Sequence, residues 1–212
     1  TIDLGIRGNI NKLISYDLTL FNLNYKDRIG FAQKEFKDGS VKSERGNIGD
    51  AIIYGLESNI DFDVNNLIIK NDNISLNVFL NTAIIDSEYI RSEENGVIGK
   101  KVEFVPNYNI KTGIKLGIGN FIFNTQYSHV STQFTDSSNA KEGNISGIIG
   151  EIPGYSLLDF SVAYRLKKIK IETGINNLTN TYYFTRRATG YPGPGIIPSP
   201  PRNSYLTLQI RF

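Results

Sequence analysis

The chain has 212 residues, a formal net charge of +2 and no cysteine. This near-neutral charge, without a long lysine and arginine cluster, gives no indication of nucleic-acid binding. The lack of cysteine excludes disulfide bonds and thiolate metal sites. No stretch approaches the roughly 18 consecutive apolar residues of a membrane-spanning helix. The chain starts at Thr1 inside an alternating segment without a signal peptide, so we interpret it as a piece of a longer product.

Apolar residues recur at every second position through much of the chain, which predicts strands with one apolar and one polar face. We expect the end of a strand over 1–8, a strand over 14–26, and a long charged loop over 27–50. Within the second segment the alternation changes phase at Phe21. That change indicates either a β-bulge or an aromatic side chain on the polar face, and the sequence does not decide between them.

The alternation resumes over 54–64 and again from 74 onwards, with a turn expected over 65–72. A polar loop is expected over 87–101. Two further strands flank a tight connection at 117–120. The strands in this middle part of the chain therefore come in pairs joined by short turns.

The last third of the chain begins with a long loop over 132–151 that is rich in serine, asparagine and glycine. Two strands follow, over 158–166 and 169–175. A loop over 181–203 then precedes a final strand, 204–212. Because no apolar pattern of helical period persists, the chain is predicted to be all-β with about nine strands.

The connections alternate between short turns and long polar loops. This two-sided asymmetry is typical of transmembrane β-barrels, whose strands are antiparallel and whose closure leaves no free edge. A soluble β-sandwich has no reason to sort its loops in this way. The short turns lie near Asn11, Asn66, Gly119 and Lys167, and the long loops lie near Gly39, Gly96, Gly143 and Pro194.

Three motifs resemble TonB-dependent outer-membrane receptors. They are the Pro-marked strand entry Phe104-Val105-Pro106-Asn107-Tyr108, the Gly-x-Glu pattern of Gly55-Leu56-Glu57, and the segment 175–183 with its Asn-Leu-Thr-Asn-x-x-Tyr order. The run 184–198 resembles the ferric-citrate-type branch of that family. The resemblance implies a bacterial outer-membrane location and an antiparallel barrel of 22 strands, of which this chain supplies about nine C-terminal strands.

The resemblance also implies the partners. Residues 1–212 are expected to form part of a barrel domain in outer-membrane lipid, with the plug domain and the first strands outside this chain. Energy is expected from the TonB complex through that plug. A ferric chelate is the expected cargo, and the branch resemblance points to ferric citrate. The barrel-assembly machinery is expected to read Leu208, Ile210 and Phe212 as an assembly signal.

Two alternatives remain open at this point. The first is a receptor of the same architecture for another cargo, such as haem, cobalamin or a glycan. The second is a β-rich surface adhesion module without a transport role. Detergent dependence separates the second from the barrel, because a lipid-facing apolar band makes a protein insoluble without detergent.

The candidate ligand-binding residues are Arg186, Arg187 and Tyr191. Guanidinium groups suit carboxylates because their forked donors can grip two oxygens. In a continued strand only one of the two arginines would point inward. Binding of lipopolysaccharide phosphates or of neighbouring loop acids is the competing interpretation. Five prolines stiffen this loop, namely Pro192, Pro194, Pro198, Pro200 and Pro201.

Catalytic and metal sites are not expected. His129, the single histidine, has no cysteine or paired carboxylate close to it in the sequence. Adjacent acids such as Glu93 and Glu94 are interpreted as solvated loop charges rather than acid–base pairs. No nucleophile elbow or phosphate-binding loop occurs. The sequence therefore predicts a protein that is not an enzyme and has no cofactor.

Overall fold

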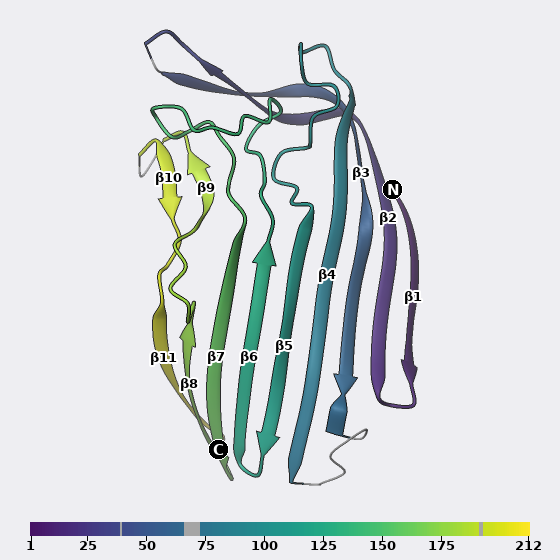
Figure 1. Ribbon diagram of the computed structural model, residues 1–212, viewed down its shortest axis with the longest axis vertical. Coiled ribbons are helices and arrows are strands. Elements are labelled where there is room, and N and C mark those ends of the chain that lie inside the picture. Colours follow the sequence, from purple (N-terminus) through teal and green to yellow (C-terminus); the bar gives the residue numbers. More distant parts are fainter. Residues whose placement is uncertain (39, 66–72, 191–192) are drawn as a thin grey trace.

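The computed structural model describes residues 1–38, 40–65, 73–190 and 193–212, without the side chains of 31–35, 43 and 44. Within this part, nine strands form one antiparallel sheet in the order β1-β2-β3-β4-β5-β6-β7-β8-β11, and two strands form a separate hairpin (Figure 1). The strands are β1 (Ile2–Ile10), β2 (Ile14–Glu35), β3 (Val41–Asp63), β4 (Ile74–Arg91), β5 (Tyr108–Ile118), β6 (Phe121–Val130), β7 (Tyr155–Leu166), β8 (Ile169–Asn176), β9 (Phe184–Ala188), β10 (Gly195–Pro198) and β11 (Asn203–Ile210).

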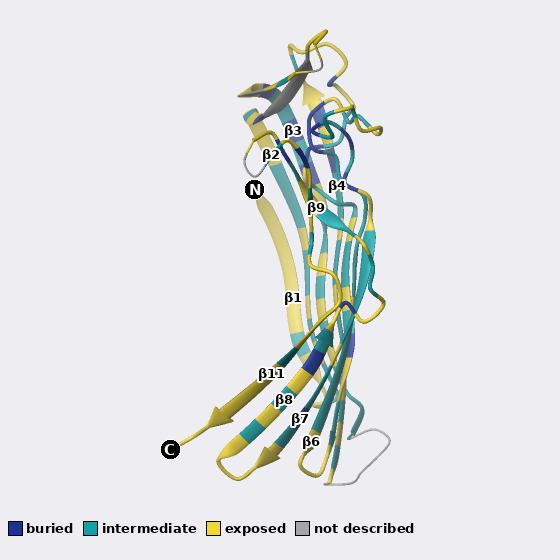
Figure 2. Cartoon of the chain, turned by 90° about the vertical axis from the view of Figure 1, so that its left-hand side faces the viewer, coloured by how far each residue is buried: buried dark blue, intermediate teal, exposed yellow. Residues whose placement is uncertain are grey.

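The predicted all-β antiparallel architecture is confirmed. Each strand from β1 to β7 pairs with the next strand in the chain. The last strand, β11, follows the β9–β10 hairpin and pairs with β8. The sheet is a curved wall whose edge strands, β1 and β11, lie to the same side of its middle strands (Figure 2). No helix among the described residues is long and apolar enough to cross a membrane.

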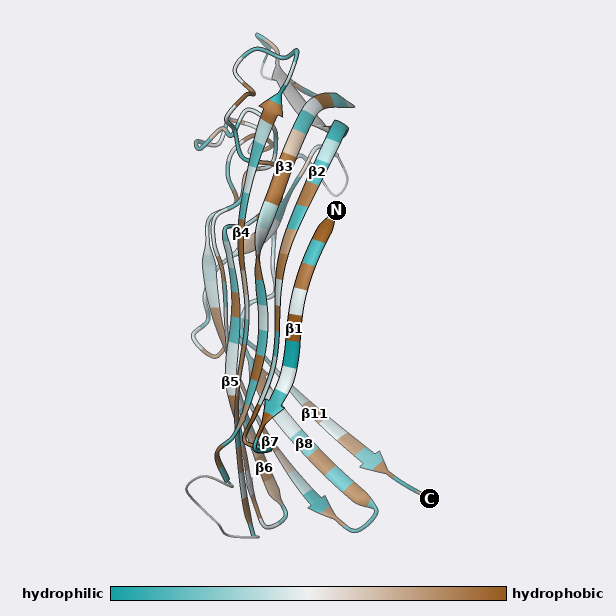
Figure 3. Ribbon diagram, turned by 90° about the vertical axis from the view of Figure 1, so that its right-hand side faces the viewer, coloured by the Kyte–Doolittle hydropathy of each residue, from teal (hydrophilic) through white to brown (hydrophobic). Residues whose placement is uncertain are grey.

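The strand register sorts the side chains into an apolar face and a polar face, and Figure 3 shows the two kinds alternating along the strands. Directly paired residues on β1 to β5 form continuous rows across the sheet. One row is Leu4, Leu20, Leu56, Ile84 and Tyr108. The neighbouring row on the opposite face is Arg7, Asp17, Asn59, Asn81 and Lys111.

The apolar face is exposed in this chain, with Leu4 at 71%, Ile114 at 49% and Leu206 at 75%. Soluble monomers rarely expose a contiguous apolar surface of this extent. On β4 the apolar face runs from Ile74 to Ile84 and ends at Asp86. Ten residues at about 3.3 Å each, tilted by about 45°, give a band roughly 23 Å high. This height matches the lipid-facing band of a transmembrane barrel.

The structure corrects the boundaries of three predicted loops. The expected loop over 27–50 is instead the outer part of a long hairpin, since β2 continues to Glu35 and β3 starts at Val41. Similarly, β4 continues to Arg91, and the loop over 181–203 contains β9 and β10. These segments carry charges on both faces, so they lack the amphipathic pattern on which the prediction relied. The predicted turn over 65–72 falls almost wholly outside the described residues.

The β2–β3 hairpin bends sharply where it leaves the wall. The register shifts between Tyr25 and Arg28 and again before Ile29, and Asp27 lies in the left-handed region with φ of 51°. β-Bulges of this kind turn a strand and increase its twist. On the partner strand, Gly49 has no room for a side chain, because a Cβ there would lie 1.9 Å from the carbonyl oxygen of Arg91. Beyond the bend the hairpin crosses above the ends of later strands (Figure 1).

The phase change at Phe21 has a structural explanation. The pairing of β2 with β3 is continuous from Ile14 to Tyr25, so no bulge occurs there. Phe21 and Leu23 lie on the polar face and pack against a small buried cluster at the loop end of the sheet. Gly55 on β3 leaves room for the Phe21 ring, to which a Cβ would come within 3.0 Å. The cluster consists of Ile48, Ala51, Ile53, Tyr89, Val97 and Val102.

The two faces predict opposite responses to the same substitution. In the complete protein, Leu80→Arg places a charge in the middle of the apolar band and is expected to destabilise the folded sheet by about 2–4 kcal/mol. Asn81→Arg, one residue further on, is the matched control. Its side chain enters the open polar face, and little change is expected. Unfolding in detergent or lipid measures both variants, and equal losses would contradict the assignment of the faces.

Candidate functional site

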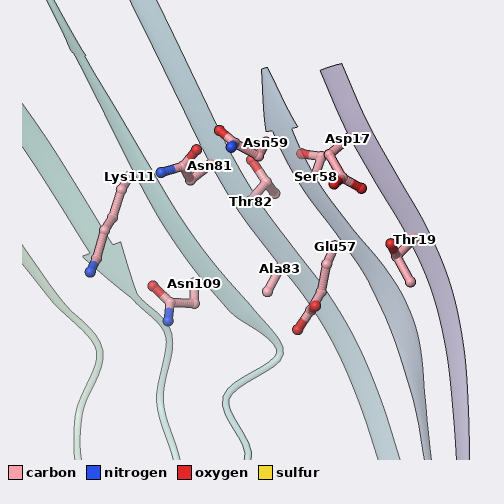
Figure 4. A pocket seen from close by; sticks show the side chains of 10 residues that line it. All are labelled: Asp17, Thr19, Glu57, Ser58, Asn59, Asn81, Thr82, Ala83, Asn109 and Lys111. Carbon is pink, nitrogen blue, oxygen red and sulfur yellow. The ribbon is translucent and has the colours of Figure 1, made fainter. Parts of the chain in front are cut away.

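The polar face of the wall carries a shallow hollow of about 520 Å³ across β2 to β5. Figure 4 shows its side chains from four neighbouring strands, with acids on β2 and β3 and a lysine on β5. Mixed charges and amides of this kind bind polar surfaces through hydrogen bonds, and no nucleophile and base are paired in it. The principal polar side chains are Asp17, Glu57, Asn59, Asn81, Asn109 and Lys111.

Above this hollow, the loop between β4 and β5 folds back along the end of β4. The amide of Tyr89 donates to the carbonyl of Lys100, and the amide of Val102 donates to the Ser87 hydroxyl. Val97 and Val102 thereby enter the buried cluster on the polar face. The loop is therefore packed against the wall and brings the next residue, Glu103, under the bend of the β2–β3 hairpin.

Glu103 is buried beside Arg28 and Tyr89. Arg28 Nη1 lies 2.8 Å from Glu103 Oε1 and donates to the Tyr89 hydroxyl at 2.6 Å, while that hydroxyl donates to Glu103 Oε2 at 2.7 Å. The carboxylate side chain is only 1% exposed. Gly30 adjoins it so closely that a Cβ would lie 2.3 Å from Glu103 Oε1. We call Arg28, Tyr89 and Glu103 the hairpin triad.

The hairpin triad is held together by the cost of burying its carboxylate. An unpaired buried carboxylate costs several kcal/mol, which the ion pair and the phenol offset only while all three groups are present. Burial, with the hydrogen bond to Glu103 adding to it, raises the pKa of Tyr89. The phenol therefore stays protonated and remains a donor. The triad ties β2, β4 and the β4–β5 loop together at the bend.

A second ionic group lies on the other side of the bend and is exposed to solvent. Arg91 Nε lies 2.8 Å from Asp50, and its Nη2 lies 3.3 Å from Asp27. The hydrogen bond from Arg91 lowers the pKa of Asp50. Exposed pairs of this kind contribute little to stability. The buried triad is therefore the stronger of the two restraints on the hairpin.

The β4–β5 loop is joined in turn to the loop between β6 and β7. The amide of Lys101 donates to Asn139 Oδ1 at 2.6 Å, and Asn139 Nδ2 donates to the Lys101 carbonyl at 2.9 Å. Phe104 lies in the left-handed region with φ of 60°, and its amide donates to the Phe134 carbonyl. A phenylalanine rarely adopts this conformation, and the surrounding contacts hold it there.

The structure places the two predicted arginines on strand β9, on opposite sides of it. Arg187 turns toward the β6–β7 loop and donates to the carbonyls of Gly147 and Glu151. Burial lowers the pKa of Arg187. Arg186 is exposed, and no hydrogen bond or ion pair joins its guanidinium to the described residues. Tyr191, the third predicted ligand-binding residue, lies outside the described residues.

The predicted assembly residues lie at the end of the sheet. Leu208 pairs with Ile171 and Ile210 with Ile169, and both stand exposed on the apolar face of edge strand β11. Phe212 follows that strand and is fully exposed in this chain. Their role in assembly stays a prediction.

The Asn-Leu-Thr-Asn motif forms the turn that ends β8. Asn177 is buried with φ of 53°, its Oδ1 accepts from the amide of Thr181, and its own amide donates to Asp159. Asn180, with φ of 55°, accepts from the amide of Arg202. Asparagine tolerates the left-handed conformation and can bond nearby backbone groups. The motif is therefore explained by backbone geometry.

The candidate metal and catalytic residues remain isolated. His129 Nδ1 lies 2.9 Å from the Ser156 hydroxyl on the neighbouring strand. Within the residues that the structure describes, no group of three or more His, Cys, Asp and Glu side chains could hold a metal ion. Glu94 follows β4 in an exposed loop, where its backbone amide donates a hydrogen bond to the Ser92 hydroxyl.

Sequence reasoning missed the hairpin triad. Arg28 and Glu103 lie 75 positions apart, and only the return of the β4–β5 loop brings them together. One signal was present in the sequence: Glu103 stands alone in the apolar run Val102-Glu103-Phe104-Val105. A single acid inside such a run indicates a buried carboxylate that requires a partner. Nothing in the sequence identifies Arg28 as that partner.

A curved antiparallel wall defines the class of transmembrane β-barrel proteins when one face is apolar over the height of the lipid-facing band and the opposite face is polar. The chain belongs to the TonB dependent receptor-like, beta-barrel family, which matches residues 1–178. The family comprises transporters and receptors of the bacterial outer membrane, not enzymes.

Solved structures share this fold. The ferric citrate transporter FecA in its unliganded form superimposes with a TM-score of 0.76 at 24% identity, covering 98% of this chain and 30% of that chain. The ferric yersiniabactin uptake receptor FyuA from Yersinia pestis gives 0.72 at 18%, covering 99% and 29%. The copper transporter OprC gives 0.70 at 19%, covering 99% and 30%. The chain thus spans less than a third of the length of these proteins.

The hairpin triad predicts a strong asymmetry between two arginines. Arg28→Ala removes the Arg28 cation from the buried Glu103 carboxylate and is expected to destabilise this end of the barrel by about 3–5 kcal/mol. Arg91→Ala, which removes an exposed pair at the same bend, is the control and should have a much smaller effect. Hydrogen exchange of residues 100–105 in the complete receptor measures both. Equal protection in the two variants would show that the triad does not hold the loop.

Proposed function

We propose that this chain is part of the barrel wall of a TonB-dependent outer-membrane transporter that takes up a ferric chelate with exposed carboxylates, such as ferric citrate. On this proposal the polar face lines the lumen, the apolar face meets outer-membrane lipid, and the long connections face the outside. Energy comes from the TonB complex through a plug domain outside residues 1–212. The protein does no chemistry on the iron, because the chelate arrives preformed.

The charge distribution among the external segments carries the choice of an anionic cargo. Residues 177–203 contain three arginines and no acidic residue. The other external segments, 26–50, 87–107 and 131–154, each contain at least three acidic residues. A negatively charged ligand is therefore attracted to residues 177–203 rather than to the other three segments. The similarity of the fold to that of FecA, described as a ferric citrate transporter, also supports an anionic ferric chelate as the cargo.

Within this segment, Arg186 is the residue that we assign to the cargo. Its guanidinium is exposed, whereas the Arg187 guanidinium is occupied by the carbonyls of Gly147 and Glu151. An exposed guanidinium can donate two parallel hydrogen bonds to one carboxylate. Tyr191 remains a candidate for ligand binding because it lies in the same segment of the sequence. Lipopolysaccharide phosphate is the competing anion for Arg186.

Other cargoes remain distinguishable outcomes. Cobalamin or a neutral glycan would require a different recognition surface, since an acid-free arginine segment favours anions. Haem carries two propionate carboxylates, so a direct comparison of haem and ferric citrate binding separates these two cargoes. A surface adhesion module has no use for an apolar face that matches the height of a lipid band. A direct test is the binding and uptake of radioactive ferric citrate by the complete receptor. Failure to bind any ferric chelate would overturn the proposed function.

The cargo contact gives a specific prediction. Arg186→Ala in the complete receptor is expected to weaken ferric citrate binding by about 1.5–3 kcal/mol, the cost of losing a charged hydrogen bond. Thr185→Ala, at the exposed and uncharged neighbouring position of the same strand, is the control and should bind like the parent. Binding is measured on outer membranes with matched receptor levels. Unchanged affinity in the Arg186 variant would remove this residue from the cargo site.

The assembly signal gives a second prediction. We propose that Leu208, Ile210 and Phe212 are read by the barrel-assembly machinery in the complete receptor. Phe212→Ala is expected to lower the amount of receptor inserted in the outer membrane several-fold, whereas Phe212→Tyr keeps the aromatic ring and serves as the control. Quantitative blotting of purified outer membranes compares the two. Equal levels of the alanine variant and the parent would contradict the assignment.

A further inference from the structure

We propose that Arg187 is a positioning residue that joins the β6–β7 loop to the β9–β10 hairpin, so that the two external segments form one unit. The joint also sets the orientation of the exposed arginine beside it, Arg186. Its consequence for cargo binding rests on the proposed function, whereas the joint itself does not.

The contact is made by a fork of donors that meets two carbonyl groups four residues apart. Nη1 lies 2.7 Å from the Gly147 carbonyl oxygen, and Nη2 and Nε lie 2.8 and 3.1 Å from that of Glu151. The guanidinium carbon lies 5.1 Å from the centre of the Phe184 ring on its own strand. The ring and the carbonyls thus hold the planar group from two directions.

A second contact brings the two backbones together beside the guanidinium. Gly147 and Gly195 have φ of 70° and 114°, and a Cβ on Gly147 would lie 3.3 Å from the Gly195 Cα. A Cβ on Gly195 would lie 3.0 Å from the Ser146 carbonyl oxygen. Because only glycines allow this approach in these conformations, the loop seats directly on strand β10. Ile148 and Ala188 are buried around the contact.

The loop has an internal structure that the joint can hold as one piece. The amide of Gly147 donates to the Asn144 carbonyl, and that of Ile149 donates to Asn144 Oδ1. The amide of Ile152 donates to the Gln133 carbonyl and closes the base of the loop. Fixing Gly147 and Glu151 therefore fixes the whole segment 143–151.

The position of Arg187 also fixes its neighbour. On strand β9, Arg187 pairs with Ile196 and Arg186 with Ile197. Side chains of adjacent strand residues point to opposite sides. When Arg187 is anchored to the loop, the strand is held in one rotation and the Arg186 guanidinium points away from the joint. Arg187 thereby orients a charged group that it does not touch.

Spin labels in the complete receptor test the joint directly. Nitroxides at Ile145→Cys and Thr185→Cys, both exposed positions in a chain without other cysteines, report the distance between the loop and the hairpin. The parent should give a narrow distance distribution, and Arg187→Ala a broad one. Arg187→Lys, whose ammonium cannot span both carbonyls, should lie between them. Arg186→Ala is the control and should match the parent.

Hydrogen exchange and binding complete the test. The amides of residues 143–151 should exchange at least about tenfold faster in Arg187→Ala, as expected for the loss of charged hydrogen bonds. Their exchange rates should be unchanged in Arg186→Ala. Ferric citrate should bind about tenfold more weakly to Arg187→Ala. Unchanged distances and exchange would overturn the joint. Changed distances with parent-like affinity would overturn its role in positioning. If the parent does not bind ferric citrate, the proposed cargo fails, while the distances still decide the joint.

Discussion

The structure depends on one constraint, which is that every residue of the wall must present its side chain to the correct face. Lipid offers no hydrogen bonds, so the backbone groups of the wall must pair with neighbouring strands. Because the side-chain period of a strand is two, a slip of one residue would exchange the faces. The register is continuous in the wall part of β2 to β8, and Leu20, Ile84 and Phe160 consequently share one face.

Beyond the apolar band this constraint is relaxed, and a different one takes over. The connections at the loop end carry charges and must fold without a large apolar core. They do so by burying a few polar groups that require partners. Glu103 joins the hairpin to the β4–β5 loop, Asn139 joins that loop to the next, and Arg187 joins the next to β9 and β10. The four external segments are thus linked in series by polar contacts.

The two constraints explain how much the sequence could predict. The orientation of Leu158, Phe160 and Val162 followed from period-two alternation, and the register confirms it. The outer half of the β2–β3 hairpin could not be found in this way, since its charged sequence shows no period-two alternation. At Phe21 the sequence left two explanations, and the fold decides for the second because a distant loop covers that part of the polar face.

The candidate site was partly within reach of the sequence for the same reason. An acid-free segment with adjacent arginines can be read from the order of residues, and so can the rule that neighbours on a strand point apart. Which neighbour is buried depends on the β6–β7 loop, whose carbonyls at Gly147 and Glu151 approach from one side only. Two identical residues therefore have different surroundings: Arg187 donates to the carbonyl oxygens of a folded loop, whereas Arg186, which we propose for the ligand, is exposed. On the proposed function, the contact of Arg187 with the loop backbone sets the side of β9 on which Arg186 meets a ligand.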